Sequence, residues 1–141
     1  MAFLAGSNPD TQIVQIYVPI GGEGAELAAR VAIAVWQHFP ERFSEVHHDL
    51  MATPVAQLDE RARFWLERTE FAAANLWKAI GSESVLEVLQ EGRLMFQELA
   101  VQVIPSFLID GLLLAGPVAT SEIQNVIDQA RDSFAPDTSR F

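Results

Sequence analysis

The apolar positions form one nearly continuous run near the start of the chain, and a long apolar segment follows it. Ile13–Val18 is rich in β-prone residues, which predicts a strand buried on both faces. Ala25–Phe39 is apolar almost all round, which predicts a largely buried helix that ends before Pro40. Phe43–Leu50 is interpreted as a second short strand. Strand, helix and strand in this order predict a βαβ unit with parallel strands and a right-handed crossover.

A helical block follows. Thr53 and Pro54 predict a helix start, with a cap and then a proline at the first helical position. Val55–Ala79 has roughly helical spacing and is long enough to break into two helices. The residues Ser84–Glu87 match a capping box for the next helix. Gly92 lies on the apolar face of that helix, where it would let a neighbouring element approach closely.

The last third of the chain returns to strand patterns. Ser106–Ile109 and Leu112–Ala115 predict two antiparallel strands, and the Asp110–Gly111 pair between them is a strong hairpin signal. Ser121–Gln124 predicts the start of the last helix with a second capping box. Ala135–Phe141 is a polar tail that we expect to be loose. The predicted order is therefore β-α-β, a helical block, and β-β-α.

Two loops border predicted strands, one in each predicted half. The loop from Gly21 to Gly24 joins the first predicted strand to its helix, and Ile104-Pro105 precedes the strand in the second half. Together with the order of the elements, these loops resemble the two halves of a thioredoxin-fold active site of the DsbA-like kind. In that family a Cys-x-x-Cys pair at the helix start faces a loop with a cis-proline.

The resemblance implies an α/β fold with a thioredoxin-like β-α-β / β-β-α core and an inserted helical block. We expect a single domain over residues 1–141. Its core would comprise residues of about 11–52 and about 101–134, and the helical insertion would span about 53–100. DsbA-like proteins and kappa-class glutathione transferases both place a helical domain at this point.

The chain departs from the family at the redox pair. Gly21 and Gly24 stand where the resemblance places the two cysteines, and the sequence contains no cysteine at all. The chain can therefore neither carry out thiol–disulfide exchange with a cysteine of its own nor bind a metal through a thiolate. In the family, the backbone beside the cis-proline also pairs with an extended peptide or with glutathione.

The resemblance therefore implies a redox-inactive module that binds a protein or peptide segment, in an accessory or chaperone role. No catalytic residue is assigned. The implied binding residues are Gly21, Gly22, Glu23, Gly24, Ile104 and Pro105.

Two alternatives stay open. A kappa-type transferase or isomerase would bind glutathione as its cofactor and activate the glutathione thiol with a hydroxyl donor. Positions 21–24 offer neither Ser nor Thr, and Tyr17 lies earlier in the predicted strand. A homodimerising structural module would instead pair two copies through the apolar helical insertion.

Other motifs give weaker signals. The glycine loop could hold an anion at a helix start, but Leu27 occupies the third glycine position of the dinucleotide pattern, which favours a flexible turn. On a strand, His47 and His48 would point to opposite faces and could not readily share one ion, so no metal site is expected.

Several cations and aromatic residues concentrate in the helical block. They could bind an acidic partner or a planar ligand, or they could be solvated arginines beside core tryptophans. These residues are Arg61, Arg63, Trp65, Arg68 and Trp77.

The negative charge of the chain limits the classes of molecule that it is expected to bind. Its formal net charge is -10 and its estimated pI is about 4.5. An acidic surface is repelled by phosphate backbones and by anionic lipid, so neither nucleic acid nor membrane is an expected partner. No apolar run approaches the length of a membrane span, and the first residues lack the pattern of a secretory leader. We therefore expect a cytoplasmic protein.

Overall fold

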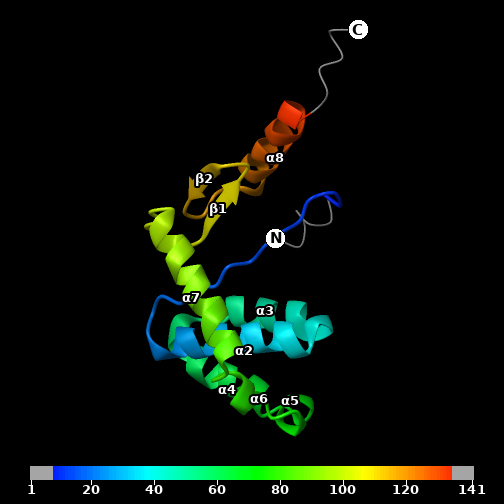
Figure 1. Cartoon of the computed structure of the whole chain (residues 1–141), viewed down its shortest axis with the longest axis vertical. Coiled ribbons are helices and arrows are strands. Elements are labelled where there is room, and N and C mark those ends of the chain that lie inside the picture. Colours follow the sequence, from blue (N-terminus) through cyan, green and yellow to red (C-terminus); the bar gives the residue numbers. More distant parts are fainter. Residues whose placement is uncertain (1–7, 135–141) are drawn as a thin grey trace. The chain divides into compact units, whose positions relative to one another are not determined.

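The computed structural model describes residues 8–134, which fall into two compact units (Figure 1). The helical unit spans Ile16–Gln97. The ββα unit combines residues 8–15 with the chain from residue 98 onward. No helix among the described residues is both long and apolar enough to cross a membrane.

The helical unit consists of six helices and two short 3-10 turns. In chain order these are α2 (Glu23–His38), the turn Pro40–Arg42, α3 (Phe43–Met51), the turn Val55–Gln57, α4 (Leu58–Leu66), α5 (Thr69–Ala73), α6 (Leu76–Ala79) and α7 (Glu83–Glu98).

Helix α2 forms the centre of this unit, as its all-round apolar pattern predicts. Every residue from Val31 to Val35 is buried, because α3, α4 and α6 pack around the helix. The start of α2 lies close to the start of α4. A Cβ placed on Gly24 would lie 3.0 Å from the backbone nitrogen of Asp59, so a larger residue would push the two helices apart.

The prediction of a strand at Phe43–Leu50 is wrong, because these residues form α3. Val46 and Leu50 are four residues apart, and both are buried on the same face of the helix. Phe43 packs against the same core. The spacing 43, 46 and 50 follows the helical period, and the residues between these positions are polar, as in a helix with one buried face.

The prediction of a strand at Ile13–Val18 is also wrong within the described structure. The segment is not assigned to any strand, and no other described strand pairs with it. The expected βαβ unit is therefore not formed by the described residues. Instead, Ile16 and Tyr17 lie close to α7, where a Cβ on Gly92 would lie 2.7 Å from the Tyr17 carbonyl oxygen. Gly92 thus permits the close approach that its position on the apolar face predicts.

Two helix-start predictions in the helical unit are wrong. Helix α7 begins at Glu83, so Ser84 lies inside it, and the Oγ of Ser82 accepts a hydrogen bond from the Val85 N–H instead (3.4 Å). Thr53 caps no following helix. Its hydroxyl donates to the Asp49 carbonyl at the end of α3 (2.7 Å).

The ββα unit forms as the sequence predicts. Strands β1 (Ser106–Ile109) and β2 (Leu112–Ala115) pair antiparallel, with Phe107 opposite Leu114. Asp110 and Gly111 both have positive φ (48° and 82°), which suits the tight turn between the strands. Helix α8 (Thr120–Phe134) begins one residue before the predicted start.

The beginning of the described chain is tied to α8. Asn8 and Gln124 exchange two side-chain hydrogen bonds (2.8 and 3.0 Å). Arg131 pairs with the carboxylate of Asp10 and also donates to the Thr11 hydroxyl. These contacts hold residues 8–11 against the helix. The predicted loose tail at 135–141 lies outside the described residues.

Candidate functional site

The loop before β1 contains Pro105, the residue that the resemblance matches to the cis-proline of the family. The Ile104–Pro105 peptide bond is cis. The Ser106 hydroxyl donates to the Val103 carbonyl (2.6 Å), which closes the loop on itself. Val103 and Ile104 are both exposed, so the loop presents apolar side chains and backbone to solvent.

Strand β1 continues this surface. Within the described residues the sheet has only two strands, so β1 pairs with β2 along one edge and its other edge has no strand partner. Such an edge carries unpaired N–H and C=O groups that an extended segment can pair with. Leu108 on β1 and Leu112 on β2 are about half exposed. The edge therefore combines backbone hydrogen-bonding groups with apolar side chains.

The glycine loop belongs to the helical unit, whereas Ile104 and Pro105 belong to the ββα unit. Gly21 and Gly22 both adopt positive φ (122° and 95°) immediately before α2. Glu23 lies in the first turn of α2, where a carboxylate interacts favourably with the helix dipole. Conformation at Gly21 and Gly22, together with the helix packing at Gly24, accounts for the glycines of this loop.

A partly buried polar pair that sequence reasoning missed lies in the helical unit. The Tyr17 hydroxyl lies 2.5 Å from Nδ1 of His47, and Phe43 stacks on the His47 ring with the centroids 5.4 Å apart. Burial raises the pKa of Tyr17 well above its usual range, so the phenol stays protonated and donates. Burial, with a further contribution from His48, lowers the pKa of His47. No short motif marks this pair, because Tyr17 and His47 are thirty residues apart in the chain.

The two neighbouring histidines have separate partners. His48 lies with Nδ1 2.7 Å from the Ser44 carbonyl of the preceding turn, while His47 contacts Tyr17. Because both lie on α3 and not on a strand, the predicted alternation between sheet faces does not apply. Among residues 8–134, no group of three or more His, Asp or Glu side chains is placed to hold a metal ion.

An arginine of the helical block forms a structural ion pair. Arg61 donates to both carboxylate oxygens of Asp49 (2.6 and 2.8 Å), and the Trp65 indole N–H donates to the same carboxylate (2.7 Å). The Arg61 hydrogen bond is the main cause that lowers the pKa of Asp49. Arg61 also lies over the Phe64 ring, 4.2 Å from its centroid. Asp49, Arg61 and Phe64 contribute to the wall of a pocket of about 440 Å³ between α3 and α4.

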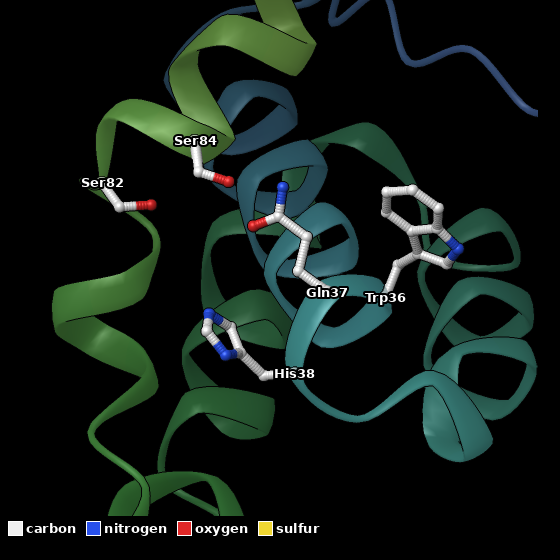
Figure 2. Close-up of a pocket in the computed structure, with 5 residues that line it drawn as sticks. All are labelled: Trp36, Gln37, His38, Ser82 and Ser84. Atoms are coloured by element: carbon white, nitrogen blue, oxygen red, sulfur yellow. The ribbon is translucent and has the colours of Figure 1, made fainter.

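A second pocket of about 550 Å³ lies where α2 ends and α7 begins. Figure 2 shows the Gln37 side chain between Trp36 on one side and the two serine hydroxyls on the other. The lining residues are Trp36, Gln37, His38, Ser82 and Ser84. Sequence reasoning missed this pocket, because its two halves are separated by more than forty residues in the chain.

Comparison with known proteins identifies the fold. No family model matches the chain, and no curated protein sequence does. A solved structure of a thioredoxin-like oxidoreductase from Silicibacter pomeroyi DSS-3 superposes with a TM-score of 0.76 and 27% identity, covering 93% of this chain and 75% of the other. Proteus mirabilis ScsC in a compact conformation gives a TM-score of 0.74 and 21% identity, covering 91% of this chain and 70% of the other.

These likenesses confirm the thioredoxin-like fold class. Among the described residues, strands are present only in the β-β-α half. The expected departure from the family also holds, because the sequence contains no cysteine. This chain has a thioredoxin-like fold and lacks the Cys-x-x-Cys pair.

Proposed function

We propose that this chain is a redox-inactive binding module that holds an extended, apolar protein segment against the outer edge of β1, beside Ile104 and Pro105. The open edge of β1 is the observation that carries the proposal. A segment laid along this edge would pair with its free backbone groups as an added strand does. An accessory or chaperone role follows, because such pairing depends on backbone conformation more than on one particular sequence.

The side chains around the edge indicate what kind of segment would bind. Val103, Ile104 and Leu108 are exposed apolar residues. Contacts with apolar side chains of a bound segment would remove these residues from water and add to the backbone pairing. The chain contributes no thiol, so the bound segment would be held without disulfide exchange.

The test uses a client that unfolds under reducing conditions. Dithiothreitol releases the aggregation-prone B chain from insulin, and light scattering follows its aggregation. Because this chain has no cysteine, the reductant leaves it unchanged. We expect the full-length protein to suppress the scattering in a concentration-dependent way.

Two matched variants locate the binding surface. Leu108→Glu places a charge beside the β1 edge, and we expect it to weaken suppression by roughly tenfold, which corresponds to about 1.4 kcal/mol. Leu94→Glu is the control, because Leu94 is similarly exposed (46% against 49%) but lies on α7. Failure of the unmodified protein to suppress aggregation, or equal losses in the two variants, would contradict the proposal.

A further inference from the structure

Trp36 differs from the other large aromatic residues at the surface of the described chain. Phe64 and Trp77 are exposed as well, but an arginine guanidinium lies over each ring, 4.2 Å from the centroid for Phe64 and 5.6 Å for Trp77. Trp36 is 56% exposed and has no ring or cation contact among residues 8–134. Its indole face is therefore open to a ligand.

The polar side chains beside Trp36 also have free hydrogen-bonding capacity. Within the described part of the chain, Gln37, His38 and Ser84 form no side-chain hydrogen bond with another residue. Ser82 accepts one bond from the Val85 N–H, which leaves its own hydroxyl proton available. Figure 2 shows both serine hydroxyls directed toward Gln37, so several donors and acceptors face the same space. The pocket thus combines one flat apolar surface with a hydrogen-bonding wall that contains no acidic residue, lysine or arginine.

The lining excludes several classes of ligand. None of the five lining residues is Asp, Glu, Lys or Arg, so the pocket offers no carboxylate for an amine and no permanent cation for a phosphate or carboxylate. His38 is its one ionisable side chain. Trp36 is the only large apolar residue in the lining, and the only other ring there is the polar His38 imidazole, so an apolar ligand would find no second apolar surface to cover it. An uncharged ligand with one apolar face and many hydroxyl groups fits this composition.

We propose that this pocket binds a neutral carbohydrate. A pyranose ring presents C–H groups on one face, which would stack on the Trp36 indole. Hydroxyl groups around its rim would exchange hydrogen bonds with the amide of Gln37 and the hydroxyls of Ser82 and Ser84. The volume of about 550 Å³ lies within the range of small-molecule sites and accommodates more than one sugar ring.

Saturation-transfer difference NMR on the intact chain tests this site, because the method detects weak binding. The probes are maltose and cellobiose, with glucuronate and glucosamine as charged counterparts. We expect transfer from the protein to the ring protons of at least one neutral sugar, and much weaker transfer to the charged sugars. Absence of transfer to both neutral sugars, or equal transfer to neutral and charged sugars, would overturn the proposal.

Two tryptophan variants assign the signal to the pocket. Trp36→Ala should reduce the transfer by roughly tenfold, in line with the loss of a stacking surface that dominates a small site. Trp77→Ala is the matched control, because it removes a similarly exposed tryptophan outside the pocket and should leave the transfer unchanged. Gln37→Ala, which keeps the indole, should reduce the transfer by a smaller factor. Unchanged binding in Trp36→Ala, or equal losses in the two tryptophan variants, would contradict the assignment.

Discussion

The helical unit and the ββα unit differ in how much apolar surface they bury. Among the described residues, every buried apolar side chain except Ile123 belongs to the helical unit. The hairpin of the ββα unit instead leaves Leu108 and Leu112 about half exposed, and the loop before it exposes Ile104. The helical unit therefore has an extensive core of its own, although it too exposes large apolar residues such as Trp36 and Leu94. The ββα unit buries little apolar surface among the described residues.

The two units therefore have different expected roles, one in the stability of the fold and the other in binding. A two-stranded hairpin contributes little independent stability in water, so exposed leucines on it do not serve a large core. Exposed apolar residues beside a free strand edge suit contact with another chain. Substitutions in the helical unit should therefore mainly change the free energy of unfolding, and substitutions at the β1 edge should mainly change binding.

The largest expected effect comes from the core of the helical unit. Phe71 is fully buried, and its ring lies 5.0 Å from that of Phe39, measured between centroids. Phe71→Ala removes this packing and leaves a cavity, so we expect a loss of about 3–5 kcal/mol in the free energy of unfolding. Urea titration followed by circular dichroism measures the loss.

The matched comparison is Phe64→Ala, which removes the same side chain from an exposed position on α4. We expect this variant to lose less than about 1 kcal/mol, because most of the cavity cost is absent. If the two phenylalanines gave similar losses, the buried cluster would not dominate the stability of the helical unit.

A smaller effect is expected where the extended N-terminal segment meets α7. Gly92→Val would drive a side chain into the Tyr17 carbonyl, since even a Cβ at this position lies only 2.7 Å from that oxygen. We expect a loss of about 1–3 kcal/mol through overpacking. Gly81→Ala is the control, because its Cβ would meet no atom closer than 3.8 Å. A stable Gly92→Val protein would show that residues 16 and 17 detach from α7 at little cost.

The same two units show what the sequence alone could predict. The hairpin was correctly predicted residue by residue because its information is local: two apolar runs flank an Asp110–Gly111 turn that only a few residue pairs form readily. Helix α2 was predicted because its apolar character extends around the whole helix. Neither element depends on a distant part of the chain for its conformation.

The failures have a different physical origin. Ile13–Val18 has strand-like composition, but a strand also needs a hydrogen-bonding partner, and the described residues provide none. The strand prediction for Phe43–Leu50 is wrong because its apolar residues, at positions 43, 46 and 50, recur at the helical period and do not alternate. Both errors concern segments whose structure is decided by packing within the helical unit.

The candidate sites divide in the same way. The loop at Ile104 and Pro105 was found because it adjoins a locally encoded hairpin. The Tyr17–His47 pair and the Trp36 pocket join residues that are thirty or more positions apart. Only the packing of α2, α3 and α7 brings these residues together, so no single motif could reveal them.

The smallest expected effect is the change in the free energy of unfolding when one ion pair from each unit is removed. Asp49 in the helical unit accepts hydrogen bonds from Arg61 and Trp65, and its pKa is lowered from the ordinary 3.8. A carboxyl group whose pKa is lower in the folded state stabilises the protein above the unfolded pKa. That contribution is lost as the pH falls through the pKa of the folded state.

Asp49→Asn should therefore lose about 1 kcal/mol in the free energy of unfolding near neutral pH. The difference from the unmodified protein should shrink below about pH 4.

Asp10 provides the counterpart in the ββα unit, since a hydrogen bond from Arg131 lowers its pKa as well. This carboxylate is exposed to water, which screens its interaction with the guanidinium. Asp10→Asn should therefore leave the free energy of unfolding within experimental error at every pH. Urea titrations of the two variants between about pH 2 and 7 distinguish them. Equal pH profiles would mean that the partly buried network around Asp49 stabilises the fold no more than an exposed ion pair does. In that case, ion pairs would not contribute to the difference in stability between the two units.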